Sequence, residues 1–429
     1  MMGMATALAQ LEAPQQVRGR WVRRVALLLV LDWMVAAPFV ELKEVDHLVP
    51  AEWTDLYPQW LGAQAVLRGT NPYTTAMTQE IQRGFYGHVL KPDEQWDQQP
   101  FVYPAHVAFL IAPLTMLPWW LTRLVTTLLA PVMVVLTAWM WMRICGVKLD
   151  RVRTGILLFL ILTSWPSIWA IRQLQPTILV AGLIAGSVLL FARRRDGWAG
   201  ILLALATVKP NLAALLCVWL VIQAVEQRRW RFLMVFLSST LVLLLAADAV
   251  LPGWIPSWIR ASIACSHQPH KTSQVVMIFG HEMGVAVTLM LLAALCCRLW
   301  KIGAAAGETA QFGQAVSLIL AATVCLMPPS NGWMLYNDLL LIPGILVLLP
   351  ARPTRPLEQV LRGLTVLSMV SMVAIAPITA AISLFVGYVP FLAILPFLNV
   401  LLPVAVLAML LFPAEAADAA GWNWLAPAW

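Results

Sequence analysis

The sequence has few charged residues. Only 11% of its 429 residues are charged and 61% are hydrophobic, whereas a soluble domain averages about 25% charged and about 45–50% apolar residues. The apolar residues gather in long blocks such as 232–250 and 364–385. Blocks of roughly 20 apolar residues match the thickness of a bilayer core. The composition therefore excludes an ordinary soluble domain and predicts an integral membrane protein in contact with membrane lipids.

The chain also lacks an even spread of positive charge. Nineteen of its 28 Lys and Arg residues fall in six short clusters, at 18–24, 143–153, 193–195, 228–231, 298–301 and 352–362. All six clusters can face the same side of a membrane, which is the positive-inside pattern of cytoplasmic loops. The net charge of +7 thus orients the protein, and we expect no nucleic-acid partner.

Several kinds of chemical motif are missing. The six cysteines form no CxxC pair and mostly lie in or beside apolar blocks, so we interpret them as small buried hydrophobic residues. A Walker loop, a dinucleotide fingerprint, a GxSxG turn and an internal repeat are also absent. His267 and His270 are three residues apart, but no third and fourth ligand accompanies them at convincing spacing. We expect neither a metal site nor a bound cofactor.

The apolar blocks predict an all-α polytopic membrane protein with about twelve transmembrane helices. The spans are 25–40, 121–141, 154–171, 177–192, 198–208, 212–225, 232–250, 283–297, 314–327, 335–349, 364–385 and 391–412. The first is interpreted as a signal anchor. The predicted domains are a cytoplasmic segment 1–24, a transmembrane domain 25–412 and a cytoplasmic tail 413–429. Segment 106–117 is apolar but too short to span, so we interpret it as re-entrant.

This topology places most polar chemistry outside. The outer loops are 41–103, with nine acidic and four basic residues, then 251–282 and about 328–338. All six histidines, at 47, 88, 106, 267, 270 and 281, lie on or beside outer loops. We therefore expect any chemistry to lie on the extracytoplasmic side of the membrane, with both termini cytoplasmic.

A helix is predicted in the first outer loop, in TDLYPQWLGAQAVLRGTNPY (54–73). Thr54 or Asp55 can cap its start, and Gly69 supplies a C-terminal stop. One apolar face recurs at helical spacing, formed by Leu56, Trp60, Ala63 and Leu67. The pattern predicts an amphipathic helix on the outer membrane surface. Asp55 is either its N-cap or a base that the positive helix end keeps ionised, and the two roles are compatible.

Two cations stand beside apolar sequence near the outer face. Lys209 lies in ATVKPNL and Arg172 in AIRQLQPTI. A cation in such a place is costly, so it either snorkels to the interface or faces a cavity or a partner. Two cations on the rim of a polar cavity would suit a phosphate group.

Five segments follow one another in an informative order. They are DLYPQWLGAQAVLRGTNPY from residue 55, YPAHVAFLIAPLTMLP from 103, RQLQPTILVAGL from 172, AGILLALATVKPN from 199 and SNGWMLYNDLLLIPG from 330. Together they resemble the landmarks of glycosyltransferase family 87 of the GT-C superfamily, over about residues 55–349. The chain departs from the usual pattern at several positions, namely Ala105, Arg172, Gln175, Tyr336 and Asn337.

The resemblance implies a GT-C-like enzyme that transfers a mannose- or arabinose-like sugar from a polyprenyl-phosphate donor to an extracytoplasmic glycan or glycolipid. It aligns Asp55 with the family's proposed base and implies inversion. Lys209 and Arg172 are then candidate phosphate partners. Further donor- or substrate-binding candidates are Gln173, Tyr103, Tyr336, Asn337, His267 and His270. The lipid-linked sugar phosphate is a co-substrate, so no separate cofactor is implied.

Two other functions fit the same composition. A transporter or flippase of a lipid-linked sugar would place its main polar groups near mid-membrane. A non-catalytic membrane subunit would not need Asp55, and no enclosed cavity would join Asp55 to Lys209. The positions of these two side chains in space therefore discriminate between the alternatives.

Overall fold

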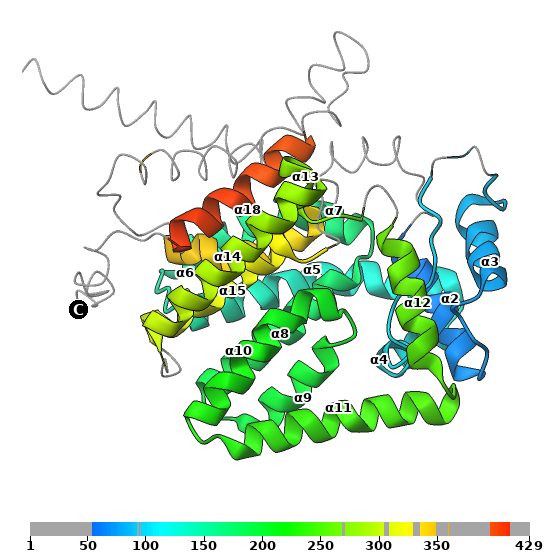
Figure 1. Ribbon diagram of the computed structural model, residues 1–429, viewed down its shortest axis with the longest axis horizontal. Helices are drawn as coiled ribbons and strands as arrows, with labels where there is room; N and C mark the ends of the chain where they lie inside the picture. The colour runs from blue at the N-terminus through cyan, green and yellow to red at the C-terminus, as the bar shows by residue number, and fades with distance from the viewer. Residues whose placement is uncertain are drawn as a thin grey trace, which may run out of the picture.

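The computed structural model describes residues 54–91, 94, 96–267, 271–303, 309–328, 335–348, 359 and 395–411. These residues form helices and no strands. Four helices belong to the predicted outer loops, namely α2 (Leu56–Leu67), α3 (Thr75–Tyr86), α12 (Trp254–Ser266) and α13 (Gln274–Phe279), and α4 (Val107–Thr115) lies in the segment 106–117 interpreted as re-entrant. Of these, α2, α3, α4 and α12 lie together at the right of Figure 1.

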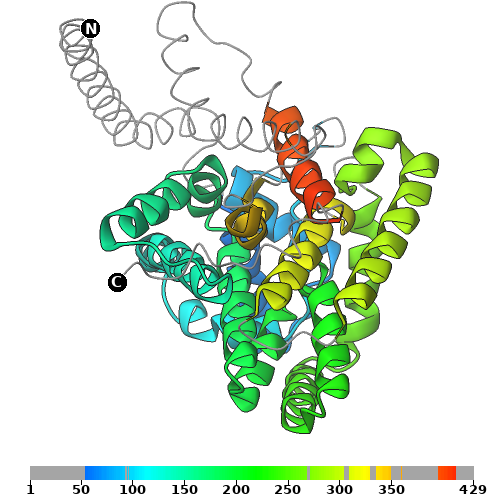
Figure 2. The same cartoon turned by 90° about the vertical axis from the view of Figure 1, so that its left-hand side faces the viewer.

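The remaining elements form a bundle. They are α5 (Trp119–Ile144), α6 (Arg151–Leu162), α7 (Trp165–Arg172), α8 (Pro176–Ala192), α9 (Asp196–Ala206), α10 (Pro210–Glu226), α11 (Trp230–Val250), α14 (His281–Ile302), α15 (Ala310–Leu326), the 3₁₀ helix η1 (Leu335–Leu341), α16 (Ile342–Leu348) and α18 (Leu395–Leu411). Helix α8 packs between α5 and α9, α9 packs against α11, and α15 packs against α10 and α18. Figure 2 shows α18 lying along α15.

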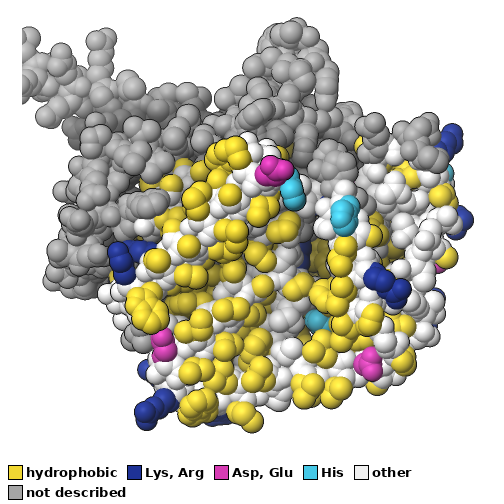
Figure 3. All heavy atoms as spheres, in the orientation of Figure 1, with side chains coloured by type: hydrophobic (Ala, Val, Ile, Leu, Met, Phe, Trp, Pro, Cys, Tyr) yellow, Lys and Arg dark blue, Asp and Glu magenta, His cyan; other side chains and the backbone are white. Residues whose placement is uncertain are grey.

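Three described helices, α5, α11 and α14, are long and apolar enough to cross a membrane, and the bent pair α6–α7 would make a fourth. Large apolar side chains on α5, α11 and α14 are exposed, as expected where a protein meets lipid. Figure 3 shows hydrophobic side chains over much of one face, with basic side chains toward its left and right edges. The chain is thus an all-helical membrane protein.

The count of twelve spans stays a prediction. Spans 25–40 and 364–385, the segment 1–24 and the tail 413–429 lie outside the described residues. Helices α8, α9, α10 and α15 have 11 to 17 residues, fewer than the roughly 20 that a straight crossing needs. Helix α4 has nine residues and is therefore about 14 Å long. It is too short to cross, in agreement with the sequence, and its re-entrant placement stays a prediction.

Two predicted spans are broken rather than continuous. The segment 154–171 is divided between α6 and α7, which meet at a bend of 56°. Pro166 begins a new helix there, because proline fits a first turn but not a helix interior. The segment 335–349 begins as η1 and becomes α-helical only at Ile342, next to Pro343. These breaks leave short connecting backbone near the outer loops.

The prediction of an amphipathic surface helix after Asp55 is correct in its bounds and wrong in its faces. Helix α2 packs on α3 and α4 and buries residues on more than one side, whereas Leu67 is exposed. Trp60 Nε1 donates to the Leu114 carbonyl at 3.1 Å, and Gln64 Nε2 donates to the Thr115 carbonyl at 3.0 Å. Spacing alone missed this because tertiary contacts also bury residues such as Gln59 and Gly62, which lie outside the predicted apolar face.

Helix α3 is the amphipathic helix of the first loop, with Met77, Ile81 and Phe85 buried. Its start is capped by Thr74, whose hydroxyl accepts from the Met77 N–H, and its end is Gly87 at φ 80°. Only glycine adopts that left-handed conformation without strain.

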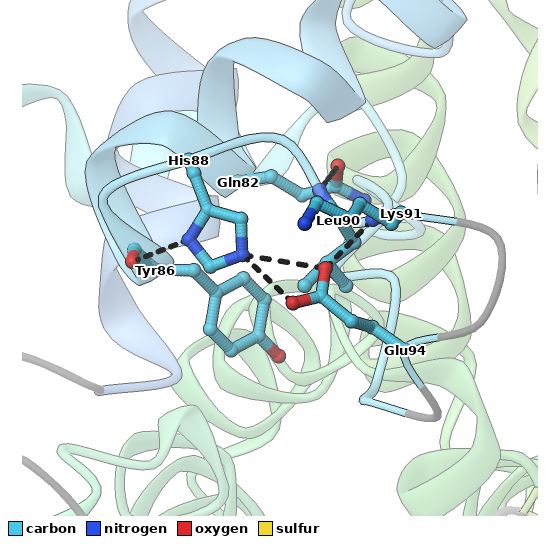
Figure 4. A network of polar contacts seen from close by, with 6 residues as sticks. All are labelled: Gln82, Tyr86, His88, Leu90, Lys91 and Glu94. Carbon is cyan, nitrogen blue, oxygen red and sulfur yellow. Dashed lines mark hydrogen bonds and ion pairs between the residues drawn. The ribbon is translucent and has the colours of Figure 1, made fainter.

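A network of polar contacts shapes the chain that follows α3 (Figure 4). His88 Nε2 lies 3.1 Å from Glu94 Oε1, and the Lys91 N–H donates to Glu94 Oε2 at 2.7 Å. Gln82 Oε1 accepts from the Leu90 N–H at 3.1 Å. Because Tyr86 Oη also donates to the carbonyl of Asp97 at 2.7 Å, these contacts hold the chain that follows α3 against this helix.

The bundle has two chemically different ends. At one end, Arg229 is 4% exposed, forms an ion pair with Asp196 and donates to the Phe191 carbonyl at 2.7 Å. The basic turns 193–195 and 228–231 lie there, at the starts of α9 and α11, and α11 begins at the lower left of Figure 1. The turns around Gln175 and Lys209 lie at the opposite ends of α8, α9 and α10.

Close helix packing depends on small residues. Ser187 donates to the Ala199 carbonyl at 2.8 Å across the α8–α9 contact. A Cβ at Gly200 would lie 2.8 Å from the Phe236 nitrogen and 3.0 Å from the Phe232 oxygen of α11. Such backbone approach between helices is typical of membrane proteins, where small residues replace the hydrophobic driving force.

We expect Gly200→Ala to lower the free energy of unfolding by about 1–3 kcal/mol, because the backbone of α11 must shift to admit the methyl group. The matched control is Gly155→Ala in α6, where nothing lies within 4 Å of the added Cβ. That variant should gain roughly 0.5–1 kcal/mol from helix propensity. Thermal unfolding of both variants in detergent checks the prediction, and equal effects would contradict it.

Candidate active site

A cavity of about 310 Å³ lies at the end of the bundle opposite the basic turns 193–195 and 228–231. Its walls come from the start of α2, the segment 97–104, the turns before α8 and α10, helix α12 and the start of η1. Trp258 Nε1 on α12 donates to the Val102 carbonyl at 2.9 Å, and Tyr73 Oη donates to the Tyr103 carbonyl at 2.8 Å. These two bonds hold the 101–103 segment against the cavity.

Asp55 stands at the N-cap position of α2, but its side chain makes no capping hydrogen bond. Its backbone N–H donates to the Gln173 carbonyl at 2.9 Å, and its carboxylate accepts a hydrogen bond from Gln175 Nε2. The carboxylate therefore faces the cavity rather than its own helix. Burial raises the pKa of Asp55 to about 6, although the positive charges of Lys271 and Lys209 oppose the shift.

Gln175 connects the two charged groups of the site. Helix α7 ends at Arg172 and the chain reverses through Leu174, at φ 47°, so that the Gln175 N–H bonds the Ala170 carbonyl at 2.9 Å. Pro176 then begins α8. Gln175 Nε2 donates to Asp55, and its Oε1 accepts from Lys209 Nζ at 3.4 Å. One amide thus satisfies a carboxylate and an ammonium at once.

Lys209 lies in the turn between α9 and α10 and is 8% exposed. Its Nζ donates to Thr177 Oγ1 at 2.6 Å and lies 5.0 Å from the centre of the Tyr336 ring. The cavity-facing interpretation of this lysine is correct, and snorkelling to the interface is wrong, because the ammonium has partners inside. Burial lowers the pKa of Lys209 to about 8, with Asp55 acting in the opposite direction.

Five of the residues selected from the sequence line the cavity, namely Asp55, Tyr103, Lys209, Tyr336 and Asn337. Arg172 and Gln173 are not among the described residues that line it. The reversal at Leu174 explains this, since it brings Gln175 to the cavity and leaves Gln173 to contribute its backbone carbonyl. His267 is exposed at the end of α12, with Nδ1 2.8 Å from the Ile263 carbonyl. His270 lies outside the described residues.

Four residues of the site were not selected from the sequence. Gln175 was noted only as a departure, and Thr177 carries no signal apart from its place in the first turn of α8. Asp97 and Lys271 line the cavity and form an ion pair of 2.6 Å. Nothing in spacing could find this pair, because 174 positions separate its members.

The described residues that line the cavity include equal numbers of acidic and basic side chains. Among the described residues that line it, the charged ones are Asp55, Asp97, Lys209 and Lys271. A carboxylate with a raised pKa beside a buried cation is an arrangement typical of active sites. The described residues contain no group of three His, Cys, Asp or Glu placed to hold a metal. The expectation that the chain has neither a metal site nor a bound cofactor stays a prediction.

Residues 101–329, more than half of the chain, match the model of glycosyltransferase family 87. The chain belongs to glycosyltransferase family 87. The resemblance to this family is thereby confirmed, with three of the five ordered segments inside the matched region, and this family 87 member is a membrane glycosyltransferase. The matched region contains Gln175, Lys209 and Lys271, whereas Asp55 and Tyr336 lie on either side of it. No curated protein and no solved structure matches the chain.

We expect Gln175→Ala to lower kcat/KM for glycosyl transfer about ten- to a hundredfold, because it removes hydrogen bonds to two charged groups. The matched control is Gln173→Ala, two residues away, which keeps the backbone carbonyl that holds Asp55. This control should stay within about twofold of the wild type, since its side chain does not line the cavity. Equal losses in the two variants would contradict the bridging role of Gln175.

Proposed function

We propose that the chain transfers a mannose- or arabinose-like sugar from a polyprenyl-phosphate donor to an extracytoplasmic glycan or glycolipid acceptor. The observation that carries the proposal is the buried carboxylate of Asp55, joined by Gln175 to the ammonium of Lys209 in one cavity. Displacement of a sugar from a phosphate needs a base for the acceptor and a cation for the leaving group. The cavity holds one of each.

The wall formed by α12 supports a lipid-linked donor. Trp258 and Ser262 of this helix line the cavity, whereas Ile255, Ile259 and Ile263 form an exposed apolar stripe along it. An apolar stripe beside an exposed Arg260 is typical of a helix in the interface of a bilayer. A donor whose tail stays in the lipid could then present its phosphate and sugar to the cavity without leaving the membrane.

The reaction follows from the placement of the two charged groups. The Asp55 carboxylate takes the proton of an acceptor hydroxyl as that oxygen attacks the anomeric carbon. The new bond joins the acceptor oxygen to this carbon, while the bond from the carbon to the phosphate oxygen breaks and leaves its electron pair on polyprenyl phosphate. Lys209 offsets the negative charge that develops there. A single displacement of this kind inverts the anomeric configuration.

The two ends of the bundle support an extracytoplasmic site. The basic turns 193–195 and 228–231 lie at the opposite ends of the helices that carry Gln175 and Lys209. By the positive-inside rule the basic turns face the cytoplasm of a bacterial-type inner membrane, which leaves the cavity outside. The predicted cytoplasmic location of both termini falls outside the described residues.

The other two functions have less support. A transporter would place its polar groups at mid-membrane, whereas here they lie where helices end. A non-catalytic subunit gives no reason to bury Asp55 and Lys209 in one cavity, at a cost of several kcal/mol for each unpaired charge.

Transfer from a panel of radiolabelled polyprenyl-phosphate sugars tests the proposal in membranes that contain the protein. We expect transfer by the wild type and a loss of at least about a hundredfold in Asp55→Asn, since a positioned base contributes that much. Asparagine keeps the shape of the side chain, and its folding is checked by the melting temperature. Equal transfer by both proteins would remove Asp55 from the mechanism.

The pH dependence of kcat/KM should be bell-shaped. Burial raises the pKa of Asp55 to about 6, so the base form accumulates as the pH rises through 6. Burial lowers the pKa of Lys209 to about 8, so its positive charge is lost as the pH rises through 8. In Lys209→Arg the fall in kcat/KM on the alkaline side should begin at a higher pH, because arginine stays charged. An unchanged alkaline limb in that variant would exclude Lys209 as its source.

A further inference from the structure

A second ion pair lies at the cavity, between two segments far apart in the sequence. Asp97 follows the polar network after α3 and is held through its carbonyl by Tyr86 Oη at 2.7 Å. Lys271 precedes α13, and its Nζ lies 2.6 Å from Asp97 Oδ2. The Lys271 side chain is 17% exposed and that of Asp97 is 37% exposed. Both line the cavity that contains Asp55 and Lys209.

The positive charge of Lys271 acts on the groups of the site. Among the charges that act on Asp55, that of Lys271 has a larger effect on its pKa than that of Lys209. Burial lowers the pKa of Lys271, but the charge and hydrogen bond of Asp97 outweigh burial and hold the pKa above its ordinary value. Asp97 therefore keeps Lys271 positively charged beside the cavity.

The proposed reaction creates a need for a second cation. A polyprenyl-phosphate sugar is a phosphodiester with one negative charge. Its product is a phosphate monoester, whose second ionisation lies near pH 6, so that it carries close to two negative charges at neutral pH. The acceptor proton meanwhile neutralises Asp55. The negative charge thus moves from the carboxylate to the phosphate, and only a cation that gains from this shift stabilises the transition state more than the bound donor.

We propose that Lys271 is this second cation, which contacts the phosphate as it becomes a leaving group, and that Asp97 is the positioning residue that aims Lys271 into the cavity. The inference rests on the proposed function, because it assumes a phosphate-linked donor. Lys209 binds the phosphate in both donor and product, since its partners Thr177 and Gln175 are neutral. Lys271 exchanges part of its bond to Asp97 for the phosphate only as the charge develops.

The first test compares Lys271→Ala, Lys271→Arg and Asp97→Asn in the full-length protein. Lys271→Ala should lower kcat about ten- to a hundredfold, the effect of losing one charged hydrogen bond, with a change in donor KM below threefold. Lys271→Arg should recover most of kcat, and Asp97→Asn should lower kcat less than Lys271→Ala does. A rise in donor KM with unchanged kcat would overturn the proposal, because it would place Lys271 in ground-state binding.

The second test separates catalysis from a merely structural ion pair. The double variant Asp97→Lys with Lys271→Asp restores an ion pair with its charges exchanged. We expect it to recover the melting temperature lost in Lys271→Ala but not the transfer activity. Recovery of both would overturn the proposal, because position 271 would then need no positive charge.

Product inhibition supplies an independent readout. A short-chain polyprenyl monophosphate should inhibit Lys271→Ala about tenfold more weakly than it inhibits the wild type, whereas the neutral polyprenol of the same length should act equally on both. Equal inhibition by the monophosphate would count against the contact. Failure of the proposed function would look different, since the wild type would then transfer no sugar from any phosphate-linked donor and the monophosphate would not compete.

Discussion

The removal of two opposite charges from water is the constraint on which the rest of the site depends. An isolated carboxylate or ammonium costs several kcal/mol to bury, so each must find charged or hydrogen-bonding partners within the protein. The amide of Gln175 forms hydrogen bonds with both Asp55 and Lys209, and Thr177 accepts a further hydrogen bond from the lysine. The left-handed turn at Leu174 makes this possible, because it reverses the chain between α7 and α8 and aims Gln175 between the two charges.

Broken and short helices serve the same arrangement. A continuous helix satisfies its own backbone and leaves little polar surface at its middle, whereas a helix end presents free backbone groups and turns. The turn after α7, the segment before the nine-residue α4 and the 3₁₀ helix η1 contribute Gln175, Pro104 and Tyr336 to the cavity wall. Close contacts through Ser187 and Gly200 hold the bundle beneath it. The bundle is therefore closely packed between α8, α9 and α11 and irregular where the site lies.

The wall of the cavity also combines segments that are far apart in the sequence. Asp97 comes from the loop after α3, Lys271 from the chain between α12 and α13, and Tyr336 from η1. Each segment contributes a group whose charge or ring acts on Asp55 or Lys209. Since the proposed reaction moves negative charge from a carboxylate to a leaving group, a site assembled from several segments allows each charge to be placed separately.

The sequence by itself determined the membrane class, the family and the approximate bounds of most described helices, and it selected Asp55 and Lys209 as candidates. These follow from residue type and from spacing along the chain, which local physical chemistry governs. Only the tertiary structure decided that Gln175 hydrogen-bonds both Asp55 and Lys209, that α2 is covered on more than one side, and that Lys271 pairs with Asp97. Those contacts join residues 120 or 174 positions apart, and no periodicity encodes a distance of that kind.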